Sequence, residues 1–107
     1  MTTFDDRKKA FESKFAHDAE TMFKAAARRN RLLGHWLAEK LKIADAEAYA
    51  KSVVVTDLQE AGDDDVVRKV MADVKEAGAA ISEAEIRDKM KAFAVQAMEQ
   101  IMSETRD

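Results

Sequence analysis

The fold is decided by residues 32–41, which read LLGHWLAEKL. Leu33, Leu37 and Leu41 are spaced four residues apart, with Leu32 and Trp36 beside them, so they share one face of a helix. This stretch is the densest apolar part of a long periodic segment that begins near the N-terminus. We therefore expect residues 32–41 to lie in the hydrophobic core.

Working outward from this stretch, few residues interrupt the helical pattern. The chain has no proline and only three glycines. Gly62 and Gly78 follow periodic segments and are expected to be left-handed C-terminal caps, while Asp45 and Ser82 are expected to be N-caps. These marks predict an all-α, four-helix bundle-like fold, with helices over residues 4–42, 46–61, 64–77 and 83–104.

The last three predicted helices each carry an apolar face, with residues three and four positions apart. The expected faces are Tyr49, Ala50, Val53, Val54, Leu58 and Ala61; then Val66, Val67, Val70, Met71 and Val74; then Ile86, Met90, Phe93, Ala97 and Ile101, with Met98 and Met102 alongside. Each of these helices therefore has one side to bury.

The first predicted helix differs from the others in both length and pattern. Its apolar line is interrupted by Lys8, Asp18 and Arg29, and an unpaired charge is costly to bury. At 1.5 Å per residue it would span about 58 Å, against about 21–33 Å for the others. Unless the helix breaks at Asn30 or Gly34, its first part must be a mobile or projecting arm. We predict one all-helical domain over residues 1–107, with an arm over 1–22 and a bundle over 23–107.

Composition excludes several classes of function. The chain has no cysteine, which excludes disulfide scaffolds and thiol catalysis. A net charge of −3 does not indicate a nucleic-acid binder, and the basic block at residues 25–31 is interpreted as a solvated helix face. No apolar run approaches the roughly 18 residues of a spanning helix, so we expect a cytoplasmic protein without membrane insertion.

No catalytic constellation is evident either. There is no glycine-rich phosphate loop, and His17 and His35 lie too far apart on one helix to share a metal ion. The acidic run at residues 63–65 is typical of a helix N-terminus. We therefore predict no catalytic residues, no metal site and no enzymatic activity.

Charge and aromatic residues are unevenly distributed. Residues 1–31 hold eight basic and five acidic residues, and four of the five phenylalanines lie within the first 23 positions. Phe4, Phe11, Phe15 and Met22 form a narrow line that suits binding in a partner's groove or packing against the chain's own bundle. An aromatic, basic first third joined to an acidic remainder suggests an interaction segment attached to a support.

Several blocks of sequence resemble the ζ subunit of the α-proteobacterial F-type ATP synthase. They are FDDR at 4–7, KFAHDAE at 14–20, FK at 23–24 and ARRNRLLGHW at 27–36, followed by YAKSV at 49–53 and EAGD at 60–63. The resemblance covers nearly the whole chain and includes the order of the last two helices.

The resemblance implies a four-helix inhibitor of ATP hydrolysis by the synthase. Its N-terminal segment would enter the interface between the α and β subunits of the catalytic head, with the central stalk as a further contact, and block rotation. The implied partner-binding residues are Phe4, Asp5, Asp6, Arg7, Lys8, Phe11, Lys14, Phe15, His17 and Asp18. Lys8 and Phe11 depart from the family pattern, but Phe11 lies on the apolar line and Lys8 suits encounter with an acidic surface.

The resemblance also places the protein at the periphery of the inner membrane, through the synthase. Adenine nucleotide binding is associated with the family, but the sequence has no phosphate-binding motif, so we predict no cofactor. The alternative function is a small helical adaptor or regulatory protein that binds another protein complex without acting on the ATPase.

Overall fold

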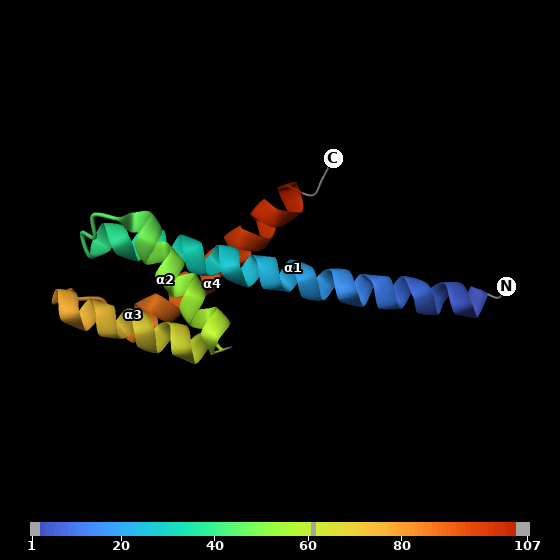
Figure 1. The fold of residues 1–107 in the computed structure, drawn as a ribbon, viewed down its shortest axis with the longest axis horizontal. Coiled ribbons are helices and arrows are strands. Elements are labelled where there is room, and N and C mark those ends of the chain that lie inside the picture. Colours follow the sequence, from blue (N-terminus) through green and yellow to red (C-terminus); the bar gives the residue numbers. More distant parts are fainter. Residues whose placement is uncertain (1–2, 61, 105–107) are drawn as a thin grey trace.

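The computed structural model describes the backbone of residues 3–60 and 62–104, and the side chains from residue 19 onward within these ranges (Figure 1). It contains four helices: α1 (Thr3–Lys40), α2 (Ala46–Gln59), α3 (Asp63–Ala77) and α4 (Glu83–Glu104). The all-α fold is therefore confirmed. Each helix begins and ends within two residues of the bounds expected from the sequence.

α1 is much longer than the body that the other helices form with it. Its 38 residues correspond to about 57 Å of helix, and the molecule measures 64 × 28 × 22 Å. α2 and α4 cross and contact the C-terminal half of α1, and the N-terminal half projects away from them (Figure 1). α1 continues through Asn30 and Gly34, so the alternative of a broken helix is wrong.

The core is built from all four helices. It contains Leu33 and Leu37 of α1, as the opening stretch predicts, together with buried residues of α2, α3 and α4. Trp36 lies at its edge, with its ring centroid 6.5 Å from that of Phe93 in an edge-to-face arrangement. The other members are Val53, Val66, Val67, Val70, Val74, Ile86 and Met90. Buried residues confirm the inward faces of helices 2 to 4, except at Leu58 near the end of α2 and Met102 near the end of α4; Ala61 lies outside the described residues.

Gly34 lies where α1 and α2 approach each other most closely. A Cβ atom added at this position would lie 2.5 Å from the Cα and 3.0 Å from the Cβ of Ala50. Such distances are far inside van der Waals separation, so the missing side chain is what allows the two helices to cross here. Gly34 therefore has a packing role and is not a weak point of the helix.

The helix caps follow the sequence at most positions. The Asp45 side chain accepts a hydrogen bond from the Ala48 amide (3.0 Å), and the Ser82 hydroxyl accepts one from the Glu85 amide (3.1 Å). Gly78 is left-handed (φ 69°), as expected. Gly62 instead precedes α3 in an extended conformation with positive φ (137°), because α2 already ends at Gln59. The expectation that Gly62 caps α2 is wrong.

The turn that closes α1 contains a left-handed residue that is not glycine. Lys42 has φ 58°, and the amides of Lys42 and Ile43 donate to the carbonyls of Glu39 (3.3 Å) and Ala38 (2.8 Å). These two bonds form the motif that commonly closes a helix around a glycine. The turn into α2 is therefore made at some conformational cost.

A polar cluster ties α2 to α3 on the outside of the core. The Tyr49 hydroxyl donates to Asp73 (2.8 Å), and the Lys69 ammonium group donates to the same carboxylate (2.8 Å). Burial, and then the bond to Asp73, raises the pKa of the Tyr49 phenol above its usual value.

Within the part of the chain that the structure describes, no helix has the length and apolar character needed to cross a bilayer.

Candidate interaction site at the base of the projecting helix

The residues assigned to partner binding from the sequence all lie on the first five turns of α1. Their backbone is helical and continuous with the rest of α1. Their side chains lie outside the residues whose side chains are described. The affected residues are Phe4, Asp5, Asp6, Arg7, Lys8, Phe11, Lys14, Phe15, His17 and Asp18. The described part of the candidate site therefore begins at the base of the arm, where α1 enters the body.

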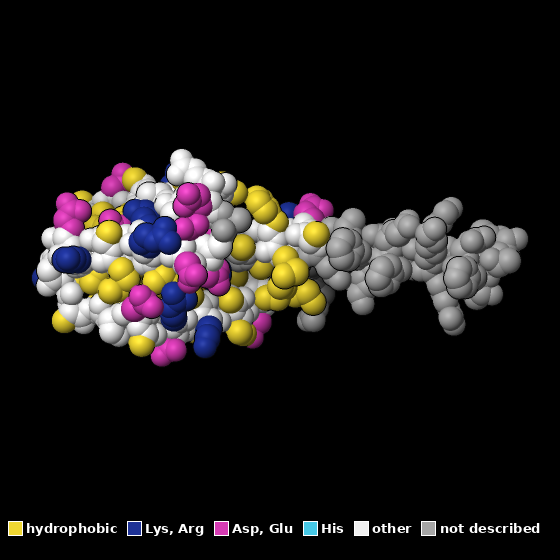
Figure 2. Space-filling view, turned by 90° about the horizontal axis from the view of Figure 1, so that it is seen from below, with side chains coloured by type: hydrophobic (Ala, Val, Ile, Leu, Met, Phe, Trp, Pro, Cys, Tyr) yellow, Lys and Arg dark blue, Asp and Glu magenta, His cyan; other side chains and the backbone are white. Residues whose placement is uncertain are grey.

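At this base, the side chains of α1 change from exposed to buried within three residues. Met22 and Phe23 are 65% and 62% exposed, whereas Ala25 is buried. Figure 2 shows hydrophobic side chains gathered on the body beside the segment that is not described. A large apolar side chain that is exposed alone is common in proteins, but a group from two helices indicates an interaction surface.

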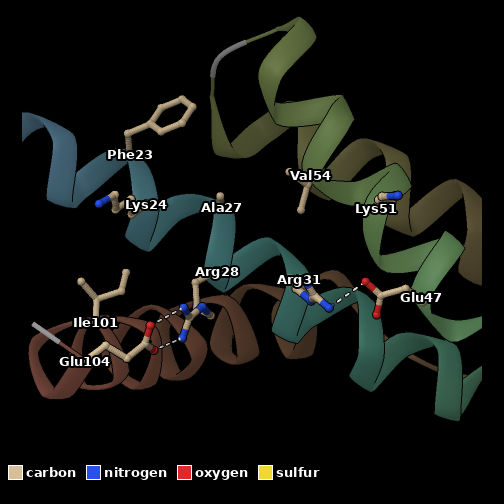
Figure 3. A pocket seen from close by; sticks show the side chains of 10 residues that line it. All are labelled: Phe23, Lys24, Ala27, Arg28, Arg31, Glu47, Lys51, Val54, Ile101 and Glu104. Carbon is tan, nitrogen blue, oxygen red and sulfur yellow. Dashed lines mark hydrogen bonds and ion pairs between the residues drawn. The ribbon is translucent and has the colours of Figure 1, made fainter.

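A groove of about 410 Å³ opens on one side of Phe23, between α1, α2 and the end of α4 (Figure 3). Its apolar lining includes Phe23, Ala27, Val54 and Ile101. Four cationic side chains also line it, namely Lys24, Arg28, Arg31 and Lys51, together with the two carboxylates of Glu47 and Glu104. We call it the cationic groove.

Both arginines of the cationic groove are held by carboxylates. Arg28 donates to both oxygens of Glu104 (2.6 and 2.9 Å), and Arg31 lies 2.7 Å from Glu47 (Figure 3). The bonds to Glu104 raise the pKa of Arg28, and the same bonds lower the pKa of the Glu104 carboxyl. His35 lies 3.2 Å from the other oxygen of Glu47. These ion pairs tie α1 to α2 and to α4. Because the carboxylates already occupy both guanidinium groups, they oppose the binding of a phosphate by the two arginines.

The two lysines of the cationic groove are less restrained. Lys24 lies 3.5 Å from Glu20 in an exposed pair on the same helix, which holds it only weakly. Lys51 is exposed and has no ion pair with any residue whose side chain the structure describes. The groove therefore presents cationic groups to an approaching surface.

A second groove, of about 360 Å³, opens on the other side of Phe23. Phe23 and Val54 line it as well, so these two side chains separate the two grooves. Leu58, which is 59% exposed, completes its apolar lining. We call Phe23, Val54 and Leu58 together the apolar collar.

Beneath the second groove lies a network of buried polar groups. Arg29 is 8% exposed and Asn30 is fully buried. Arg29 donates through Nε and Nη2 to the Asn30 amide oxygen (3.1 and 2.8 Å) and through Nη1 to Asp63 (2.8 Å). The Asn30 amide nitrogen donates to Asp57 (2.8 Å). The network joins α1 to the end of α2 and the start of α3.

This network corrects the interpretation of residues 25–31 as a solvated face. Arg28 and Arg31 lie at the surface, but Arg29 points into the body and is balanced by Asp63 and, at 3.8 Å, by Asp57. A buried charge is tolerated when it is paired and hydrogen-bonded. Among the described side chains, no buried polar atom lacks a hydrogen-bond partner.

Sequence reasoning missed Leu58 as part of the site and placed it in the core. Its position on the apolar line of α2 suggested burial, but in the last turn of α2 its side chain is 59% exposed. Met102 is likewise exposed near the end of α4. The sequence signal that could have found Leu58 is its closeness to the end of the helix, two residues after Thr56 and shortly before Gly62.

The described residues form no group of three His, Asp or Glu side chains placed to hold a metal ion. The features that dominate the site are exposed apolar side chains flanked by charges, at the foot of a projecting helix. Fold and site together define a small all-helical protein with a surface suited to binding another protein.

Comparison with known protein families agrees with this class. The family described as ATPase inhibitor subunit zeta has a model that matches residues 1–100, and the chain belongs to this family. The match includes the arm and almost all of the body. Among curated proteins, no match to the chain is found. The family description gives the chain a regulatory role as an ATPase inhibitor subunit.

Proposed function

We propose that the chain inhibits ATP hydrolysis by the F-type ATP synthase, and that residues 1–22 are its inhibitory arm. The arm enters the interface between the α and β subunits of the catalytic head and blocks rotation. The observation that carries this proposal is the geometry of α1, a continuous helix whose C-terminal half lies in the core and whose N-terminal half extends beyond the body. Membership of the inhibitor family supplies the ATPase as the target.

The arm suits a cleft because a single helix is about 10–12 Å wide, whereas the body is too wide to follow it. Phe4, Phe11 and Phe15 would be buried on insertion, and each phenylalanine contributes about 1.5–3 kcal/mol when it is fully buried. Lys8 and Lys14 speed encounter with an acidic surface. The remaining polar contacts are assigned to Asp5, Asp6, Arg7, His17 and Asp18.

In this proposal, the protein acts at the cytoplasmic face of the inner membrane through its contact with the synthase. It does not insert into the bilayer, bind nucleic acid or catalyse a reaction. The α and β subunits are its direct partners, and the central stalk is a further contact.

The proposal is tested by adding the chain to the ATP synthase of its source organism and measuring ATP hydrolysis. The full chain is expected to inhibit, and a chain that begins at Thr21 is expected to lose inhibition. The truncated chain keeps every member of the main core cluster, since these lie between residues 33 and 90. Equal inhibition by both chains would show that the arm assignment is wrong.

A point variant gives a second test with a matched control. Phe15→Ser is expected to weaken inhibition, whereas Val95→Ser, an exposed apolar residue on α4, is expected to leave it unchanged. Affinity capture from the native lysate distinguishes the adaptor alternative. Recovery of a different complex, with no synthase subunits and no effect on hydrolysis, would favour that alternative.

A further inference from the structure

We propose that the apolar collar of Phe23, Val54 and Leu58 is a second contact surface for the ATPase. The collar packs against the protein surface around the cleft that receives the arm. This inference rests on the proposed function. It adds a partner contact made by the body, outside residues 1–22, and it predicts which chemistry the partner presents there.

The first support is the convergence of exposed apolar side chains. Phe23 of α1 and Leu58 of α2 are each about three-fifths exposed, and both line the second groove. Val54 lies far from Phe23 in the sequence but beside it in the structure, and it lines both grooves. Val54 is half-buried, whereas Phe23 and Leu58 remain largely exposed, and a group of exposed apolar side chains is typical of a surface that a partner covers.

The second support is the continuity of the collar with the arm. Met22 lies on the same helical line as Phe4 and Phe15, and it is 65% exposed beside Phe23. The same helix becomes covered at Ala25. The apolar line that the sequence predicts for the arm therefore reaches Met22, which is next to Phe23 of the collar in the chain.

The third support is geometric. A cleft that admits one helix stops the body, which is 22 to 28 Å across in its two shorter directions. When the arm is inserted to residue 22, the partner surface around the cleft meets whatever surrounds the base of α1. Phe23 and Leu58 lie at that base, so they are among the side chains of the body that this surface would cover.

Charge defines the partner chemistry further. On one side of the collar, Lys24 and Lys51 face outward and are weakly held or unpaired among the described residues. On the other side, Asp57 and Asp63 are turned to Arg29 and Asn30. The surface that fits the collar is therefore apolar at its centre and carries carboxylates opposite the two lysines.

The test uses the full chain with Leu58→Asp, and Val95→Asp as the matched control. Both residues are exposed apolar side chains on helices, 59% and 61% exposed, but Val95 lies on α4 away from both grooves at the base. We expect the concentration for half-maximal inhibition to rise about tenfold for Leu58→Asp and to stay unchanged for the control. Circular dichroism checks that both variants keep the fold.

A second measurement reports on the collar independently of inhibition. The chain contains no cysteine, so Leu58→Cys and Val95→Cys can each carry one environment-sensitive fluorophore. On binding the ATPase, the emission at position 58 is expected to shift to shorter wavelength, and the emission at position 95 is expected not to change. The same shift in the isolated chain at rising concentration would identify a second copy as the occupant and overturn the proposal.

Failure of the collar and failure of the proposed function give different results. In one case, Leu58→Asp inhibits like the native chain and the emission of the fluorophore at position 58 is unchanged, while Phe15→Ser still loses inhibition. The proposed collar contact is then wrong, and the arm assignment stands. If the native chain neither binds nor inhibits the ATPase, the proposed function fails and the collar fails with it.

Discussion

The two halves of α1 belong to one continuous helix but have opposite surroundings. From Ala25 to Lys40, the helix is crossed by α2 and α4 and supplies Leu33 and Leu37 to the core. The described residues just before it, 19–24, are mostly exposed and include two large apolar side chains. Because an isolated helix is only marginally stable in water, the covered half has to support the projecting half. Comparison of the two halves of α1 therefore distinguishes residues that stabilise the fold from exposed residues that a partner can bind.

The largest expected effect contrasts one residue from each half. Leu37→Ala removes a fully buried side chain and is expected to lower the free energy of unfolding by about 2–5 kcal/mol. Met22→Ala removes a mostly exposed side chain and is expected to change it by no more than about 0.5 kcal/mol. Urea denaturation followed by the fluorescence of Trp36, the chain's single tryptophan, measures both.

A similar loss of stability in the Met22 variant would contradict this division of α1. It would mean that the residues at the base of the arm pack against the body in solution. The measurement therefore tests directly whether Met22 and its neighbours are free for a partner.

The next effect concerns the polar network that fixes the base of the arm. Asn30→Leu removes the acceptor of two Arg29 hydrogen bonds and the donor to Asp57, and leaves a buried guanidinium group partly unsatisfied. The expected loss is about 3 kcal/mol, since unpaired buried polar groups cost more than an average hydrogen bond gains. Arg31→Leu, at an exposed position, is the control and is expected to change stability by less than about 1 kcal/mol.

This network also shows where sequence reasoning reaches its limit. The four helices, their bounds within two residues and most of the core could be predicted, because helical periodicity and capping residues act locally. The burial of Arg29 could not, because Arg28, Arg29 and Arg31 are alike in the sequence. What distinguishes them is the position of Asp57 and Asp63, which only the packing of α2 and α3 supplies.

Like the fold, the candidate site could be predicted from the sequence only in part. The apolar line through Phe4, Phe15 and Met22 and the excess length of the first helix predicted an arm, and α1 is as long as the sequence predicts. The contribution of Leu58 was not visible, because an apolar residue on the inner line of a helix normally packs inward. Its exposure at the end of α2 depends on how the other helices pack around it, which the spacing of apolar residues does not reveal.

A smaller effect is expected at the crossing of α1 and α2. Gly34→Ala gains helix propensity but places a methyl group 2.5 Å from the Ala50 Cα atom, so the helices must move apart. The expected net loss is about 1–2 kcal/mol, from the range typical of overpacking. Thermal unfolding followed by circular dichroism measures it.

The Ala50→Gly change in the same background shows whether the crossing is the cause. It removes the methyl group at 3.0 Å, but the backbone of residue 50 still crowds the new side chain, so it is expected to restore only part of the lost stability. If Gly34→Ala alone raised the melting temperature, the close approach would be disproved, and Gly34 would again be a weak point of α1.

The smallest expected effect lies at the end of the covered half, and it is stabilising. Lys42 holds a left-handed conformation that glycine adopts without strain, so Lys42→Gly is expected to raise the free energy of unfolding by about 0.5–1 kcal/mol. Gly78→Lys makes the reverse change in the same type of cap and is expected to lower it by a similar amount. Since both caps belong to the body, neither variant is expected to alter inhibition of the ATPase. A change in inhibition without a change in stability would mean that the turn after α1 itself contacts the partner. The turn would then belong to the binding surface and not only to the supporting body.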